Sequence, residues 1–191
     1  MSDKANDALA RIAIEDTQHW LLQAVVGLNL CPFAKSVVVK DMVRYRVCAS
    51  AEPDDVLALL REELLYLAAA DPHTLDTTLL IAPNALPDFL DFNDFLAECD
   101  AVLMDLELDG VLQVADFHPR YQFGGTDEDD IENFTNRTPY PTLHLLREAS
   151  IDKAVEAYPD ASLIFERNME VLNKLGHAGW EALGIQARLK A

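Results

Sequence analysis

Hydrophobic residues recur at helical spacing in three long segments of the chain. In residues 5–28 the apolar side chains fall three and four positions apart, and Gly27 and Asn29 suit the end of that helix. Pro53–Ala70 and Pro87–Leu108 show the same periodicity, and the second carries the clearest apolar stripe. The pattern predicts three amphipathic helices, each of which buries one face.

Shorter segments between these helices are typical of β-strands. Met42–Ala49 alternates apolar and basic side chains, Thr77–Ala82 is a continuous apolar run ended by proline, and Val111–Phe117 follows a turn at Asp109-Gly110. Alternating helices and strands favour an α/β (or α+β) fold, with a small sheet of about three strands covered by helices. The length of 191 residues, without a visible linker, predicts a single domain over residues 1–191.

The last third of the chain is expected to be mainly helical. Pro141 suits the first position of a helix, so we expect helices at about 141–158 and 161–175, with a short turn near 178–183. Residues 118–140 show no period, and loops of that length in compact domains are usually functional or disordered.

Charge and composition exclude several classes of partner. The chain has 15 Lys and Arg against 33 Asp and Glu, a formal net charge of −18, which disfavours nucleic acids and anionic membrane surfaces. We find no apolar run of membrane-spanning length and no signal-peptide pattern, so we expect a cytoplasmic protein. The three cysteines form no CxxC pair, which indicates reduced thiols rather than disulfides or a zinc finger. The oligomeric state stays open.

The candidate chemistry is concentrated between Phe117 and Arg147, which hold two of the five histidines. His118 is expected at the carboxyl end of a strand, where open α/β sheets bind ligands, and with His144 it suits proton transfer near neutral pH. The alternative for His118 is a hydrogen bond that shapes the loop. The predicted substrate-binding residues are Arg120, Tyr121, Asn136, Arg137, Tyr140 and Arg147, whose arginines would bind a carboxylate or phosphate or pair with local acids.

Metal binding is a weaker hypothesis. Asp116 and His118 alternate along one strand face and, with His144, offer two nitrogens and a carboxylate. Their spacing matches no known metal motif, so no metal is assigned and the cofactor is unknown. The acidic run Asp127–Glu132 lacks the glycine and glutamate of an EF-hand loop, so we expect a solvated loop or a flap hinged at Gly124-Gly125.

Cys31 is the cysteine with the most reactive predicted setting. Pro32 favours a short helix to about Val38, which would place Cys31 at its N-cap, where the helix dipole lowers a thiol pKa. Cys31 is therefore a candidate nucleophile, although free cysteines are most often small buried residues. Cys48 and Cys99 are expected in the core.

Several motifs together resemble an uncharacterised bacterial family known only as a domain of unknown function. The matching stretches are Val26–Ala34, Asp76–Leu80, Phe92–Leu96, Phe117–Phe123, Asn136–Pro141 and His144–Glu148. The likeness runs from about Trp20 to Trp180, and the Cys-Pro-Phe-Ala and Phe-His-Pro-x-Tyr pieces are the most specific. Thr138 stands where the family more often has serine. The resemblance implies a bacterial cytosolic single-domain protein and carries no activity or catalytic residue.

The leading functional hypothesis is a pocket for a small anionic metabolite between residues 117–147 and the Cys31 loop. Cys31, His118 and His144 would be its catalytic groups if it is an enzyme. One alternative is a thiol-based redox protein that uses Cys31. Another is an acidic protein-interaction module without catalysis, whose complexes would weaken with salt.

Overall fold

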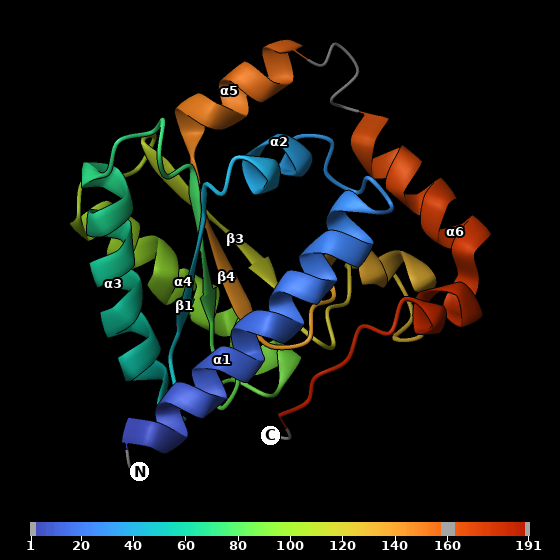
Figure 1. The fold of residues 1–191 in the computed structure, drawn as a ribbon, viewed down its shortest axis with the longest axis horizontal. Coiled ribbons are helices and arrows are strands. Elements are labelled where there is room, and N and C mark those ends of the chain that lie inside the picture. The colour runs from blue at the N-terminus through green and yellow to red at the C-terminus, as the bar shows by residue number, and fades with distance from the viewer. Residues whose placement is uncertain (1–2, 158–162, 190–191) are drawn as a thin grey trace.

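Figure 1 shows a twisted sheet with helices packed on both of its faces. The computed structural model describes residues 3–157 and 163–189. The elements are α1 (Asp3–Trp20), the π-helix η1 (Leu21–Val26), α2 (Ala34–Val39), β1 (Val43–Val47), α3 (Pro53–Ala69), β2 (Thr77–Ile81), α4 (Phe89–Asp105), β3 (Leu112–Phe117), the 3₁₀ helix η2 (Ile131–Asn136), β4 (Thr142–Arg147), α5 (Glu148–Ala157) and α6 (Ile164–Ala182). This is the mixed α/β fold with a helical C-terminal region that the sequence predicts.

The sheet has four strands in the order β1-β2-β4-β3. β1 and β2 are parallel and joined through α3, whereas β4 runs antiparallel to both β2 and β3. The prediction of about three strands is therefore one strand short. None of the described helices has the length and hydrophobicity needed to cross a membrane.

The missed strand is β4, which lies where the sequence predicts the start of a helix at 141–158. Only the part from Glu148 onward is helical, as α5. Leu143 and Leu145 face one side of the sheet, but Leu146 interrupts the apolar alternation. Short apolar runs of this kind fit a helix or a buried strand equally well. Pairing with strands on both sides, which sequence does not show, makes the segment a strand.

Other helix boundaries also differ from prediction. The first helix changes to π-helical geometry at Leu21 rather than continuing unchanged to residue 28. α2 begins at Ala34 with Phe33 at its N-cap, so Cys31 is not the N-cap residue. α6 continues to Ala182 through a non-helical Gly176, joining two predicted segments. The predicted start at 161 lies outside the described residues.

Local chemistry accounts for the ends of the well-predicted helices. Pro53 occupies the first turn of α3. Backbone N–H groups there have no partner within the helix, so the missing N–H of proline costs no hydrogen bond. Asp88 is the N-cap of α4, and its Oδ1 accepts hydrogen bonds from the backbone N–H groups of Leu90 (2.9 Å) and Asp91 (3.4 Å).

The two faces of the sheet pack against different cores. One face carries Leu80, Leu143 and Leu145, which contact the buried apolar sides of α3 and α4. The other face carries Leu79 and Phe117, which pack with residues from η1 and α6. Because strand side chains alternate between faces, this division decides which predicted site residues can meet.

Candidate functional site

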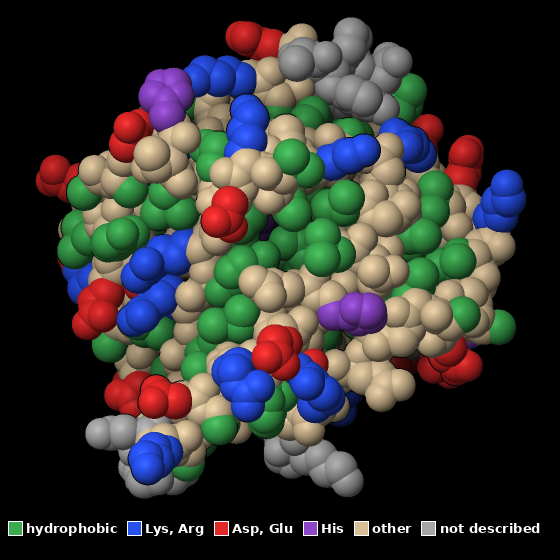
Figure 2. All heavy atoms as spheres, in the orientation of Figure 1, with side chains coloured by type: hydrophobic (Ala, Val, Ile, Leu, Met, Phe, Trp, Pro, Cys, Tyr) green, Lys and Arg blue, Asp and Glu red, His purple; other side chains and the backbone are tan. Residues whose placement is uncertain are grey.

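A cavity of about 380 Å³ lies between the second face of the sheet and the helices that cover it. Its apolar walls include Trp20, Leu21, Val25, Leu30, Phe33, Ala34, Val37, Val38, Val43, Leu79, Ala115, Phe117, Leu146, Ile151 and Ala154. In Figure 2 hydrophobic side chains gather in the middle of the face that α1, α2 and α6 border in Figure 1. Among the described residues, no lysine or arginine lines this cavity.

The π-helix η1 supplies part of the cavity wall. Leu21 and Val25 are buried and line the cavity, next to Trp20 at the end of α1. Gly27 follows η1, and a Cβ atom there would lie 2.3 Å from the carbonyl oxygen of Gln23. The wide turn therefore requires glycine. Single π-helical turns inside longer helices are frequent at functional sites.

His144 projects into this cavity from β4. It lies opposite Ala115 of β3 in the register, and its ring centroid is 6.0 Å from that of Phe117. Burial lowers the pKa of His144 to about 4, so the imidazole is neutral at pH 7. Its ring makes no hydrogen bond with another described residue, which leaves both nitrogens available to a guest.

Gln113 is a second polar residue of the cavity. Unlike His144, it belongs to no motif that predicts a site residue. It lies opposite Leu146 in the register, so Gln113 and His144 occupy the same sheet face on adjacent strands. The Gln113 side chain also makes no hydrogen bond within the described part of the chain. Only the register of β3 against β4, which follows from tertiary pairing, places it beside His144.

Several other polar residues of the wall already form hydrogen bonds. The Ser150 hydroxyl donates to Asp76 Oδ1 at 2.6 Å, and Asn168 Nδ2 donates to the Leu30 carbonyl at 2.9 Å. Thr77 Oγ1 donates to the Leu145 carbonyl at 2.5 Å. The side chains of His144, Gln113, Thr135 and Cys31 form no hydrogen bond within the described part of the chain, so they are the groups best placed to contact a ligand.

Cys31 lies in the loop before α2 and also lines the cavity. It is partly exposed, whereas Cys48 and Cys99 are buried. Burial raises the pKa of Cys48, and it raises that of Cys99 to about 12. The N-cap argument for an activated thiol does not hold, but the access of Cys31 to a cavity does.

His118 lies on the opposite side of the sheet from His144. It is completely buried, its Nε2–H donates to the Leu86 carbonyl (3.1 Å), and its Nδ1 accepts from the backbone N–H of Arg120 (3.0 Å). The rings of Phe89 and Phe92 pack near it, and burial lowers its pKa. With both nitrogens used by the backbone, His118 joins the end of β3 to the segment before α4.

The hypothetical metal set is not assembled. Asp116 pairs in register with Leu143, so its side chain shares a face with that leucine and not with His144. Burial raises the Asp116 pKa. Within residues 3–157 and 163–189 no three His, Cys, Asp or Glu side chains are grouped to hold a metal ion.

The three predicted anion-binding arginines serve three separate places. Arg120 is exposed and pairs with Asp88 at 2.7 Å. Arg147 donates to the last carbonyls of α3, at 2.7 Å to Leu67 and 2.9 Å to Ala70. Arg137 donates instead to carbonyls of the 121–128 loop. None of the three lines the large cavity.

Of the remaining predicted binding residues, Asn136 lines the cavity, whereas Tyr121 and Tyr140 lie outside it. Asn136 lines the cavity, with Nδ2 3.4 Å from the Asp116 carbonyl. Tyr121 packs its ring against Phe89 and Phe123, away from the cavity. Tyr140 is buried, and its hydroxyl donates to Asp16 Oδ2 (2.6 Å) on α1. The structure thus brings together Cys31, Asn136 and His144, and separates the other predicted residues from them.

The acidic loop is held to η2 by hydrogen bonds. Asp127, Glu128, Asp129 and Asp130 are exposed, as expected for a solvated loop. The fully buried Asn133 accepts from the backbone N–H of Phe123 (2.9 Å) and donates to the Asp127 carbonyl (2.8 Å). These bonds tie both ends of the loop to η2.

Comparison with known proteins identifies a family but no activity. The model of the family described as "Protein of unknown function (DUF1415)" matches residues 12–182. Neither the search of curated proteins nor that of solved structures finds a match.

Proposed function

The chain belongs to the DUF1415 family of proteins of unknown function, and from its cavity we propose that it binds a small, largely apolar, uncharged molecule. The observation that carries this proposal is the lining of the 380 Å³ cavity: mostly hydrocarbon, with no lysine or arginine among the described residues. A cavity of this size and character is typical of small-molecule sites. Transfer of apolar ligand surface from water would supply most of the binding free energy.

An anionic ligand fits these walls poorly. An anion would lose its hydration without gaining a cationic partner, and a neutral His144 cannot provide one at pH 7. The proposal therefore replaces the anionic metabolite expected from sequence with a neutral ligand. His144 and Gln113 would bind its one polar group, such as a hydroxyl or an amide, because they share the sheet face and neither has a hydrogen-bond partner among the described residues.

Binding of 2-naphthol tests this proposal, since the probe is apolar, carries one hydroxyl and fluoresces. We expect saturable binding, and at least tenfold weaker binding of naphthalene-2-sulfonate, which replaces the hydroxyl with a charge. Ala115→Phe, beside His144, should abolish binding by filling the cavity. Ala101→Phe on the exposed side of α4 is the matched control and should bind normally. Equal binding by the sulfonate, or unchanged binding in Ala115→Phe, would contradict the proposal.

The thiol-based alternative keeps one specific observation in its favour: Cys31 is the partly exposed cysteine and lines the cavity. We therefore expect iodoacetamide to modify Cys31 at least tenfold faster than Cys48 or Cys99, whose pKa values burial raises. Peptide mapping by mass spectrometry measures the three rates. Protection of Cys31 by 2-naphthol would connect the thiol to the ligand site, and equal slow labelling of all three would remove the redox alternative.

A further inference from the structure

A second cavity, of about 220 Å³, lies beside the Phe134–Arg137 segment, which also borders the large cavity. Thr135 and Asn136 line the large cavity, whereas Phe134 and Arg137 line the small one. The opposite wall of the small cavity comes from Trp180 of α6 and from residues 185–187 of the C-terminal segment. Figure 1 shows η2 beside α6, with the C-terminal segment (red) passing close by.

Among the described residues that line this second cavity, Arg137 is the charged one. Its Nε donates to the Tyr121 carbonyl (3.1 Å), and one terminal nitrogen donates to the Glu128 carbonyl (2.6 Å). Its guanidinium carbon lies 4.3 Å from the centre of the Phe134 ring. These contacts hold the guanidinium plane in one orientation at the cavity wall.

The positive charge of Arg137 is poorly compensated. No carboxylate of the described residues forms an ion pair with it, and Glu128 and Asp129 act only from a greater distance. Burial is the main influence on its pKa and lowers it. Arg147 also donates only to carbonyls, but those end α3, where the helix dipole offsets its charge. The carbonyls that the Arg137 side chain contacts, those of Tyr121 and Glu128, belong to a loop and not to the end of an α-helix.

We propose that this cavity binds a small monocarboxylate, with its carboxylate on Arg137. The N–H groups of Nη1 and Nη2 that the two loop carbonyls do not use match the two oxygens of a carboxylate, and charge-assisted bonds of this kind are stronger than neutral ones. The side chains of Trp180 and Ile185 offer apolar surface for a short hydrocarbon tail. Phosphate, which needs donors around several oxygens, fits less well a wall whose described residues include one cation. None of the described residues that line this cavity also lines the large one, so the monocarboxylate would bind whether or not the large cavity holds a neutral ligand.

Titration with butyrate, followed by NMR, tests this site. We expect saturable shifts of the Arg137 Nε–H and Trp180 indole N–H signals. Butyramide, the same shape without charge, should bind at least tenfold more weakly, and Arg137→Gln should weaken butyrate binding by at least tenfold. Equal binding of butyramide, unchanged binding by Arg137→Gln, or tighter binding of inorganic phosphate would overturn the proposal.

A second variant tests the site without removing Arg137, which also holds the 121–128 loop. Ala187 lines the cavity and is exposed, so Ala187→Phe should obstruct it while the rest of the spectrum stays unchanged. Loss of butyrate binding in folded Ala187→Phe supports the site. Undiminished binding in that variant places butyrate elsewhere and contradicts it, whether or not Arg137→Gln folds.

Discussion

At the scale of single residues, His118 and His144 show how one side chain type serves two purposes. Burial lowers the pKa of both imidazoles. The ring of His118 is bound on both nitrogens by backbone groups, so its place is structural. The ring of His144 lines a cavity and has no such partners among the described residues. The availability of the ring nitrogens, rather than the residue type, separates a loop support from a candidate ligand contact.

Replacement of His118 by Phe should destabilise the fold. The aromatic shape is kept, but the buried Leu86 carbonyl and the partly buried Arg120 N–H would lose their partners, at a cost of about 2–4 kcal/mol. Urea denaturation measures the free energy of unfolding. Arg120→Ala, which removes an exposed ion pair, is the control and should cost less than about 1 kcal/mol. If His118→Phe lowers the free energy of unfolding as little as Arg120→Ala does, the His118 ring is not a structural support.

His144 should make stability depend on pH. Its pKa falls from 6.5 to about 4 on folding, so the unfolded chain binds the proton more tightly between those values. The contribution of neutral His144 to the free energy of unfolding is fully present above pH 6.5. It is lost as the pH falls toward 4, with a slope of up to about 1.4 kcal/mol per pH unit. Denaturation across this range should give a smaller slope for His144→Phe. The exposed His73→Gln control should keep the wild-type slope; an unchanged slope in His144→Phe would contradict burial as the cause.

At the scale of elements, η1 depends on the glycine that follows it. Gly27 has an ordinary negative φ, so the requirement is space and not conformational freedom. A methyl group there meets the Gln23 carbonyl of the wide turn, and the backbone must shift to receive it. Such a shift would move Leu21 and Val25, which line the cavity.

Gly27→Ala should therefore reduce stability by about 1–3 kcal/mol, a typical cost of overpacking, and should also weaken 2-naphthol binding. Gly124→Ala is the matched control, because nothing lies within 4 Å of its added Cβ and its φ is not positive. Urea denaturation and fluorescence titration measure the two effects. Equal stability of both variants would mean that the π-helical turn adapts without strain.

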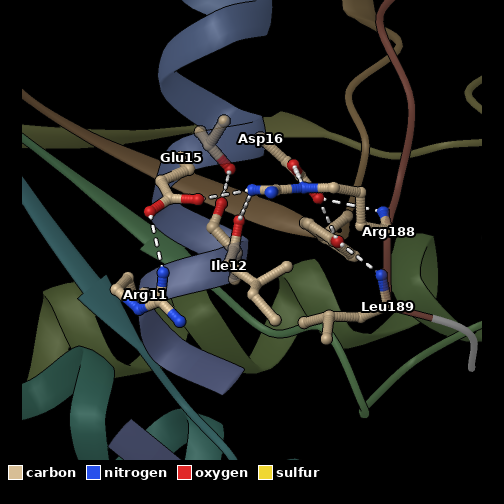
Figure 3. Close-up of polar contacts among 9 residues, drawn as sticks. Arg11, Ile12, Glu15, Asp16, Arg188 and Leu189 are labelled. Atoms are coloured by element: carbon tan, nitrogen blue, oxygen red, sulfur yellow. Dashed lines mark hydrogen bonds and ion pairs between the residues drawn. The ribbon is translucent and has the colours of Figure 1, made fainter. Parts of the chain in front are cut away.

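At the scale of the whole molecule, a polar network joins the two ends of the chain. Figure 3 shows Arg188 of the C-terminal segment between Glu15 and Asp16 of α1. Its Nε donates to Asp16 Oδ1 at 2.5 Å, and a terminal nitrogen pairs with Glu15 Oε2 at 2.7 Å. The Tyr140 hydroxyl donates to Asp16 and accepts from the backbone N–H of Leu189 (3.0 Å). The buried Asp16 carboxylate thus joins α1 to two distant parts of the chain, at Tyr140 and at Arg188.

Asp16→Ala and Arg188→Ala should each destabilise the fold, with non-additive effects. Removing Asp16 leaves the buried Tyr140 hydroxyl without its acceptor, so we expect a loss of about 2–4 kcal/mol. Arg188→Ala should cost less because its side chain is half exposed, and the double variant should resemble Asp16→Ala alone. A double-mutant cycle by thermal or urea denaturation measures the coupling. Additive losses would show that the two residues act separately.

Much of the fold follows from local patterns, but the candidate site does so only in part. The apolar stripe of α4 and the buried run of β2 are readable in sequence because each repeats its own period. Cys31, Asn136 and His144 were singled out and do line one cavity. Gln113 was missed because its place beside His144 depends on strand register, which no local pattern encodes.

The sequence by itself determined the mixed α/β class, most helices and strands, and the family to which the chain is assigned. Tertiary structure decided that residues 142–147 form the fourth strand, and on which face each side chain of that strand lies. The pairing of this strand places His144 on the opposite face of the sheet from Asp116 and His118. It also leaves the three predicted arginines outside the large cavity. The physical reason is that a strand's neighbours set its register, and a shift of one residue moves every side chain to the opposite face.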